Sequence, residues 1–342
     1  MNREKDKRWS RRGFLSTLAL AGAGSLLKWP TDSPAAEPPP ETTRVRLIRS
    51  PDICLAPLYM AEEQLLYGEG FTDVQYVQGT GGQDDIKLAA NGVTDFIGGF
   101  VGRHLAGLDA GDPIVILSGL HIGCFELFGN QRVRSIRDLK GKQVAVTRQT
   151  SGRHIFLSVM AAHVGLDPRK DINWVTDPVD KSIQLFADGK IDAFMAFPPE
   201  PQELRAKKIG HVVVNTALDR PWSEYFCCMI VANQEFVRKH PVATKRALRA
   251  ILKANSICAL EPARSARTLV DKWYPATNYD YALQTIREIP YGQWRDYDPE
   301  DTVRFYALRM NEVGMIKSSP QKIISQGTDW RFWRELKKEL KA

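Results

Sequence analysis

The chain has 342 residues, 43% of them hydrophobic and 25% charged, which allows one or two domains with apolar cores. Its net charge of +7 could suit a nucleic-acid-binding protein. However, residues 1–36 hold seven of the 47 basic and three of the 40 acidic residues, so the chain from Glu37 onward carries only +3. Composition therefore gives no indication of a nucleic-acid partner.

The first 36 residues have the pattern of a twin-arginine signal peptide. Arg11 and Arg12 stand in a basic segment and precede about fifteen weakly apolar residues, a length typical of an export signal and too short to cross a bilayer. A retained anchor is disfavoured because this stretch is rich in Ala and Gly and has no Cys nearby for lipidation. Small residues at 35–36 suit cleavage, and we expect 37–43 to be a disordered, proline-rich spacer. The sequence thus predicts a periplasmic protein, soluble after cleavage, with the twin-arginine translocase as its partner during export.

From Arg44 the chain alternates strand-like and helix-like segments. A first unit has predicted strands at 44–50, 72–78, 94–99 and 113–119, with helices at 56–70, 83–92 and 101–111. A second unit has predicted strands at 143–148, 171–176, 191–197 and 211–215, with helices at 135–142, 152–166, 180–190 and 198–208. The apolar run 224–233 is a further predicted strand, and the chain from Gln234 is helical. This order predicts an α/β protein with two lobes, a cleft between them and a helical C-terminal tail.

Ligands of such sheets bind at the carboxyl ends of the strands, where the turns here are rich in Gly, Pro, Ser and Thr. In one of them, Thr150, Ser151 and Gly152 stand between a predicted strand and a predicted helix. They could form a helix cap, a catalytic centre of Ser151 with His154, or a cradle of N–H groups for a ligand. Cap and cradle are compatible with each other. Catalysis is disfavoured because no Gly-x-Ser-x-Gly motif and no orienting acid can be identified.

No metal site or cofactor is predicted. His121-x-x-Cys124 could supply two ligands, but the sequence offers no Cys-x-x-Cys, His-x-x-x-His or His-Glu-x-x-His partner motif. The five cysteines are an odd number and are interpreted as small buried residues. Without an assembled set of catalytic groups, the chain is interpreted as a binding protein.

Five segments, taken in order and spacing, resemble the nitrate/sulfonate/taurine type of ABC-importer solute-binding protein, a group related to thiamine-pyrimidine-precursor binders. The segments are "LYMAEEQLLYGEGF", "GQDDIKLAANGVTDFIGG", "DLKGKQVAV", "ADGKIDAFMAFPPEPQEL" and "VANQEFVRKHPVATKRALRAILKA". The likeness covers Arg44 to about Asp271. It implies a type II periplasmic-binding fold, with lobe one from 42–120 plus 224–342, lobe two from 121–223, and crossings near "GLHIG" and "SEYFCC".

The resemblance also implies which positions face the ligand. The expected ligand-binding residues are Pro51, Asp52, Ala56, Pro57, Gly79, Thr80, Gly99, Phe100, His121, Thr150, Ser151, Gly152, Phe197, Glu200, Trp222 and Tyr225. The turns "SPDICLAP" and "HIGCFELF" are largely apolar, which disfavours a small inorganic anion as the ligand.

The function that follows is the exported substrate-binding component of an ABC importer, a monomer without enzymatic activity. It would capture a small organic solute, which could be anionic, between its lobes and deliver it to a permease in the inner membrane. One alternative is an enzyme of the thiamine-pyrimidine-synthase-like branch, in which adjacent cysteines such as Cys227 and Cys228 belong to a larger cluster. Another is a binding protein that serves a sensor.

The export signal can be tested directly. Replacement of both Arg11 and Arg12 by Lys should leave the uncleaved precursor in the cytoplasm, because the arginine pair is the feature that the translocase recognises. Immunoblots of cell fractions would measure this. Normal export of the double variant would contradict the twin-arginine assignment.

Overall fold

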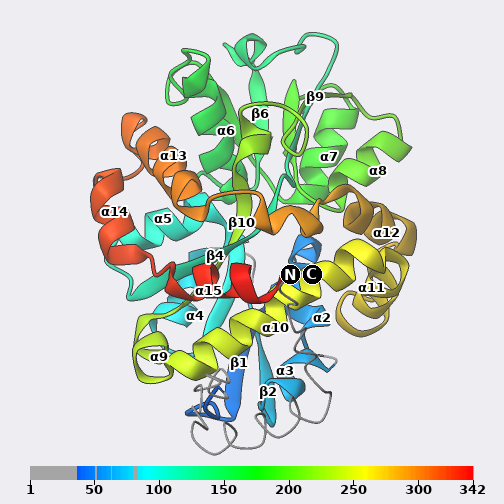
Figure 1. The fold of residues 1–342 in the computed structure, drawn as a ribbon. Coiled ribbons are helices and arrows are strands. Elements are labelled where there is room, and N and C mark those ends of the chain that lie inside the picture. The colour runs from blue at the N-terminus through cyan, green and yellow to red at the C-terminus, as the bar shows by residue number, and fades with distance from the viewer. Residues whose placement is uncertain (1–36, 51, 63, 80–82, 342) are drawn as a thin grey trace, which may run out of the picture. The chain divides into compact units, whose positions relative to one another are not determined.

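The described structure contains two five-stranded sheets. The computed structural model describes residues 37–50, 52–62, 64–79 and 83–341, so the predicted signal with Arg11 and Arg12 lies outside it. Every element below belongs to a single unit, 39–342. Figure 1 shows the second sheet with α6 to α8 in the upper half of the view and the first sheet in the lower half.

The first sheet has the strand order β2-β1-β3-β10-β4. β1 (Arg44–Arg49) pairs in parallel with β2 (Asp73–Gln78) and β3 (Phe96–Phe100). β10 (Phe226–Asn233) runs antiparallel to β3 and to β4 (Ile114–Ile122). All residues of β3, β4 and β10 are buried: β3 and β10 are interior strands of the sheet, and the edge strand β4 is buried as well.

The second sheet has the strand order β7-β6-β8-β5-β9. β6 (Gln143–Val146) pairs in parallel with β7 (Asn173–Thr176) and β8 (Ala193–Ala196). β5 (Glu126–Gly129) lies antiparallel to β8 and to β9 (His211–Asn215).

The two sheets follow one plan. Each has three parallel strands, then an antiparallel strand, then a last strand on the edge. In each case the antiparallel strand, β5 or β10, is the first strand that the chain forms after it arrives from the other sheet. The predicted α/β class and the predicted strand at 224–233 are therefore confirmed.

Helices cover both sheets. Those before β10 are α2 (Ala56–Met60), α3 (Leu65–Gly68), α4 (Gln83–Ala90), α5 (Val101–Asp109), α6 (Gly152–His163), α7 (Val179–Ala187) and α8 (Glu200–Ala206). The tail contains α9 (Gln234–Lys239), α10 (Pro241–Leu260), α11 (Pro262–Thr268), α12 (Tyr279–Glu288), α13 (Pro299–Glu312), α14 (Pro320–Gly327) and α15 (Arg331–Glu339). The helix predicted at 56–70 is two short helices, α2 and α3, separated by turns. No helix among the described residues combines the length and the apolar character that a membrane crossing needs.

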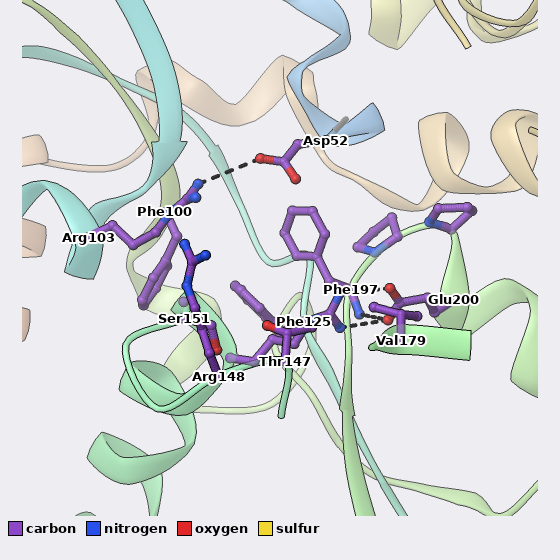
Figure 2. Close-up of a pocket in the computed structure, with 14 residues that line it drawn as sticks. Asp52, Phe100, Arg103, Phe125, Thr147, Arg148, Ser151, Val179, Phe197 and Glu200 are labelled. Carbon is purple, nitrogen blue, oxygen red and sulfur yellow. Dashed lines mark hydrogen bonds and ion pairs between the residues drawn. The ribbon is translucent and has the colours of Figure 1, made fainter. Parts of the chain in front are cut away.

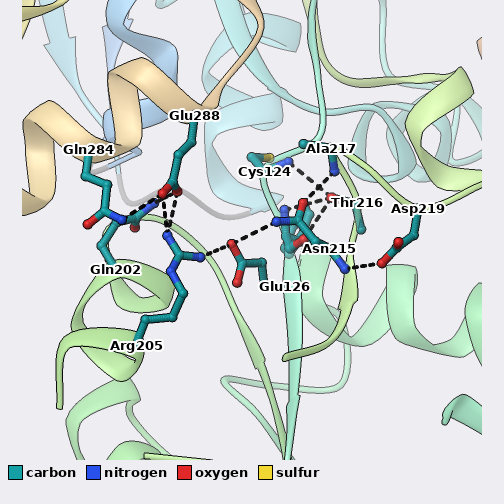
Figure 3. Close-up of polar contacts among 11 residues, drawn as sticks. Cys124, Glu126, Gln202, Arg205, Asn215, Thr216, Ala217, Asp219, Gln284 and Glu288 are labelled. Carbon is teal, nitrogen blue, oxygen red and sulfur yellow. Dashed lines mark hydrogen bonds and ion pairs between the residues drawn. The ribbon is translucent and has the colours of Figure 1, made fainter. Parts of the chain in front are cut away.

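The tail connects the two lobes. α13 contacts α5 beside the first sheet and α6 beside the second, and α12 contacts α8. At the second contact Arg205 of α8 forms an ion pair with Glu288 of α12 at 2.6 Å and another with Glu126 of β5, as Figure 3 shows. The side chains of Gln202 and Gln284 each donate a hydrogen bond to Glu288 at 2.8 Å.

The two segments that cross between the sheets lie against each other. The hydroxyl of Thr216, on the returning segment, accepts hydrogen bonds from the N–H groups of Cys124 at 3.2 Å and Phe125 at 3.0 Å, and donates one to the Phe125 carbonyl at 2.8 Å. Gly123 has a positive φ of 48°, and a Cβ placed there would lie 2.3 Å from the Cα of Ala217. The crossings therefore pack backbone against backbone, which only glycine permits at position 123.

A substitution at this contact should be costly. Gly123→Ala should lower the free energy of unfolding by several kcal/mol, because the strain of positive φ, about 1–2 kcal/mol, adds to a clash with backbone that cannot move aside. Urea denaturation followed by circular dichroism would measure it. Gly189→Ala is the matched control, since Gly189 has φ 69° with no atom within 4 Å of the added Cβ. Equal losses in the two variants would contradict the close packing of the crossings.

Candidate functional site

A cavity of about 360 Å³ opens between the two lobes. Its walls come from both sides, as Figure 2 shows: one wall carries Asp52, Phe100 and Arg103 from the first lobe. The remaining lining residues are Phe125, Thr147, Arg148, Ser151, Gly152, Arg153, Val179, Phe197, Pro198, Pro199 and Glu200. The cavity thus lies at the carboxyl ends of β3, β6 and β8, where ligands of such sheets bind.

The N-terminus of α6 forms part of the wall. Ser151 is the N-cap residue, and its hydroxyl accepts a hydrogen bond from the backbone N–H of His154 at 3.3 Å. Ser151 and Gly152 also line the cavity. The predicted cap is therefore confirmed, and the positive end of the helix dipole faces the space where a ligand would lie.

Ser151 and His154 do not form a catalytic pair in this structure. The hydrogen bond to Ser151 comes from the backbone of His154, while the imidazole packs edge-on against Trp174 with ring centroids 4.6 Å apart. Burial lowers the pKa of His154 to about 4, so the ring is neutral at physiological pH.

Two of the three arginines at the cavity are held by carboxylates. Arg153 makes a bidentate ion pair with Glu200, with both N–O distances 2.6 Å, and also donates to the carbonyl of Met195 at 2.8 Å. On the opposite wall, a guanidinium nitrogen of Arg103 lies 3.6 Å from a carboxylate oxygen of Asp52. Burial raises the pKa of Asp52, and Arg103 and a hydrogen bond from Ser50 oppose that rise. These pairs fix two guanidinium groups on opposite walls.

Arg148 differs from the other two. It lies two residues after the end of β6, its side chain is exposed at the cavity, and it forms no ion pair with any carboxylate of the described residues. With three guanidinium groups and two carboxylates, the cavity lining has an excess of one positive charge. That charge lies beside the N-terminus of α6, so both features favour a negatively charged ligand group.

Aromatic side chains form the apolar part of the cavity. Phe125 packs edge-on against Phe100 and lies 4.9 Å from the Phe197 ring centroid. Phe100 also stacks on Phe156 of α6 with centroids 5.1 Å apart, and through this contact the first lobe touches the second. The site therefore combines a cationic face with an aromatic one.

The structure brings six of the residues expected from the sequence to the cavity: Asp52, Phe100, Ser151, Gly152, Phe197 and Glu200. Pro51 and Thr80 lie outside the described residues. The others are described but do not line the cavity: Ala56, Pro57, Gly79, Gly99, His121, Thr150, Trp222 and Tyr225.

Several residues of this second group have other contacts. Trp222 packs edge-on against Phe156 and His163 of α6, and Tyr225 stacks on Phe305 of the tail with centroids 3.9 Å apart. Gly99 makes room for a lining residue, because a Cβ there would lie 2.7 Å from a guanidinium nitrogen of Arg103. Ala56 and Pro57 are buried in the first turn of α2.

Sequence reasoning missed the arginines. Arg148 and Arg153 flank the Thr-Ser-Gly turn, and two cations around a predicted helix N-terminus are a sequence signal for an anion-binding site. Arg103 and Phe125 gave no such signal, because their place at the cavity depends on how the lobes meet.

The fold now defines the class of the molecule. It is similar to the crystal structure of the periplasmic nitrate-binding protein NrtA from Synechocystis PCC 6803, with a TM-score of 0.75 and 17% identity over 89% of this chain and 90% of that one. At this identity the likeness shows the fold alone. The chain has the two-lobed periplasmic-binding-protein fold of type II that its sequence predicted.

The chain belongs to the NMT1/THI5-like family, whose model matches residues 53–265, more than half of its length. It is 30% identical over 94 residues to the bicarbonate-binding protein CmpA of Synechococcus elongatus, a match that spans 28% of this chain and 20% of CmpA. It is 23% identical over 243 residues to the 4-amino-5-hydroxymethyl-2-methylpyrimidine phosphate synthase THI13 of Saccharomyces cerevisiae, covering 67% of this chain and 70% of THI13. The relatives of this chain therefore include proteins named as binders and proteins named as enzymes.

A substitution can separate the two possible roles of Ser151, as the N-cap of α6 and as a contact to the ligand. Ser151→Ala should lower the free energy of unfolding by about 1 kcal/mol, because the N–H of His154 loses its cap. It should also weaken solute binding if the hydroxyl contacts the ligand. Chemical denaturation and calorimetric titration of the same preparation would measure the two effects. Full stability after the substitution would contradict the capping role, and unchanged affinity would limit Ser151 to that role.

Proposed function

We propose that the protein is the exported solute-binding component of an ABC-type importer and that it captures a small organic anion in the cleft between its lobes. The observation that carries this proposal is Arg148, which has no carboxylate partner among the described residues and lies beside the capped N-terminus of α6. A relative and a structural neighbour named for anions, bicarbonate for CmpA and nitrate for NrtA, support a negatively charged ligand.

The size and lining of the cavity favour an organic anion over a bare inorganic one. About 360 Å³ lies within the range of small-molecule sites, and it is several times the volume of an ion the size of one or two waters, at about 30 Å³ each. Phe100, Phe125 and Phe197 offer an apolar or aromatic body a surface to pack against. We therefore expect a carboxylate or sulfonate head at Arg148 and a carbon skeleton against the phenyl rings.

Closure would link capture to delivery. Asp52 and Arg103 stand on one lobe, and Arg148 and Ser151 on the other, so a ligand that contacts both walls favours the closed arrangement. In an importer the permease would recognise that arrangement. A sensor would recognise the same closed form. The chemistry of the cleft therefore does not distinguish a permease from a sensor as the partner.

The synthase alternative receives less support. Among the described residues that line the cavity, no nucleophile is paired with a base, and Ser151 and His154 serve in capping and packing. Cys227 and Cys228 are at most 2% exposed, so their thiols are out of reach of a substrate in the cleft.

A thermal-shift screen tests this function. The chain from Glu37 onward should be stabilised by at least one carboxylate or sulfonate, by about 2.7 kcal/mol at a concentration 100 times the Kd. Arg148→Gln should bind that compound about 10- to 100-fold more weakly, because a charge-assisted contact is lost. Arg137→Gln, an exposed arginine of the same lobe away from the cavity, is the matched control.

Two outcomes would overturn the proposal. One is stabilisation by uncharged or cationic compounds alone, with Arg148→Gln and Arg137→Gln binding equally well. The other is chemical turnover of a compound that leaves the melting temperature unchanged, which would favour the synthase alternative.

A further inference from the structure

Four potential metal ligands from distant parts of the sequence meet near the crossings. They are His121 and the cysteines Cys54, Cys124 and Cys228, and their ligand atoms all lie within 4.8 Å of one another. Each is at most 7% exposed. We call this group the thiol–imidazole cluster. The sequence had offered only the pair His121-x-x-Cys124, and the fold supplies the two partners that this pair lacked.

The backbone positions these side chains from three directions. Cys54 lies in the 3-10 turn η1 (Ile53–Leu55) that follows β1. His121 of β4 and Cys228 of β10 are partners across the antiparallel ladder, at a point where the register shifts on both sides of Cys228. Such irregularities redirect side chains out of the normal alternation. Cys124 follows on the first crossing, where Thr216 holds its N–H.

The imidazole of His121 is prepared to act as a ligand. Its Nδ1 lies 3.0 Å from the carbonyl oxygen of Ile122, and a carbonyl only accepts, so the ring proton belongs on Nδ1. Nε2 then carries the lone pair, and it is buried with no hydrogen-bond partner among the described residues. A metal-bound histidine has this arrangement, with its second nitrogen donating to a carbonyl or carboxylate. A buried acceptor without a partner is otherwise costly.

The spacing of the sulfurs agrees with tetrahedral coordination. The Sγ atoms of Cys54 and Cys228 are 3.9 Å apart. With metal–sulfur bonds of about 2.3 Å, two sulfurs of a tetrahedral site lie about 3.8 Å apart. Three thiols and one imidazole are a ligand set of structural zinc sites, and soft thiolates discriminate against Mg²⁺ and Ca²⁺.

We propose that the thiol–imidazole cluster binds one divalent metal ion of the thiophilic kind, Zn²⁺ above all, at the junction of the lobes. The site goes beyond solute capture and does not depend on it. Asp52 and Phe125, which line the cleft, lie two residues from Cys54 and one residue from Cys124. The ion would therefore join the turn that carries Asp52 to the crossing that carries Phe125.

The first test uses the unsubstituted protein. The full chain, purified without immobilised-metal chromatography and with oxygen excluded, should contain about one Zn²⁺ per chain by inductively coupled plasma mass spectrometry. After removal of the metal by a chelator, Co²⁺ should restore one equivalent and give the thiolate-to-cobalt absorption of a tetrahedral site. Circular dichroism would confirm that the stripped chain is still folded.

Matched variants locate the ion. Cys54→Ser and Cys228→Ser should weaken Co²⁺ binding by about 100-fold or more, because each removes a direct ligand. Cys258→Ser should keep the affinity of the unsubstituted chain, since Cys258 is equally buried but lies in α10 outside the cluster. No solute is needed for these measurements, so their outcome is independent of the transport proposal.

Three results would overturn the site. One is a folded, fully reduced chain that binds no Co²⁺ or Zn²⁺. A second is equal metal affinity in Cys54→Ser, Cys258→Ser and the unsubstituted chain. The third is a disulfide between Cys54 and Cys228 in protein recovered from the periplasm, shown by thiol counting and peptide mapping, because that bond would consume two of the ligands.

Discussion

The contact between the two crossing segments is the constraint on which the rest of this molecule depends. Gly123 lies so close to Ala217 that no side chain fits between them, and the hydroxyl of Thr216 makes three hydrogen bonds to the opposite segment. The segments are therefore in close contact here, and this contact adds to those that the tail makes with both lobes. Phe125 of the first crossing lines the cavity, and Cys124 of the same crossing belongs to the thiol–imidazole cluster.

The strand arrangement that the two sheets share explains why the polar and charged side chains of the cavity lie close together. In both lobes the parallel strands direct their carboxyl ends toward the cleft, so the turns after β3, β6 and β8 meet there. Carboxylates neutralise Arg103 and Arg153 within their own lobes, which lets these buried guanidinium groups be held without a ligand. Arg148 has no such partner among the described residues, and its charge is left for a ligand. The proposed preference for an anion therefore rests on one residue of the cavity rather than on overall charge.

Sequence reasoning succeeded where the signal was local. Periodicity identified the strands and the helical tail, and the Thr-Ser-Gly turn identified the N-cap of α6, because both features depend on neighbouring residues. Fewer residues could be predicted where a side chain reaches the cavity only because distant segments of the chain come together. Arg103 reaches the cavity only because Gly99 leaves space for it, and Phe125 only because the first crossing passes under the cleft. Trp222 and Tyr225 were expected at the ligand but pack against α6 and the tail.

The grouping of the cysteines could not be predicted from the sequence either. Cys54 and Cys228 are separated by 174 residues, so no spacing motif could have linked them to His121 and Cys124. Their burial argues against a nucleophilic or redox role, since reactive thiols need access to their substrates. The proposed metal ion would give Nε2 of His121 the partner that it lacks among the described residues, which packing alone does not. If such an ion joins the turn after β1 to the first crossing, it stiffens the wall that carries Asp52 and Arg103, and the solute then meets a preorganised face rather than one it must order itself.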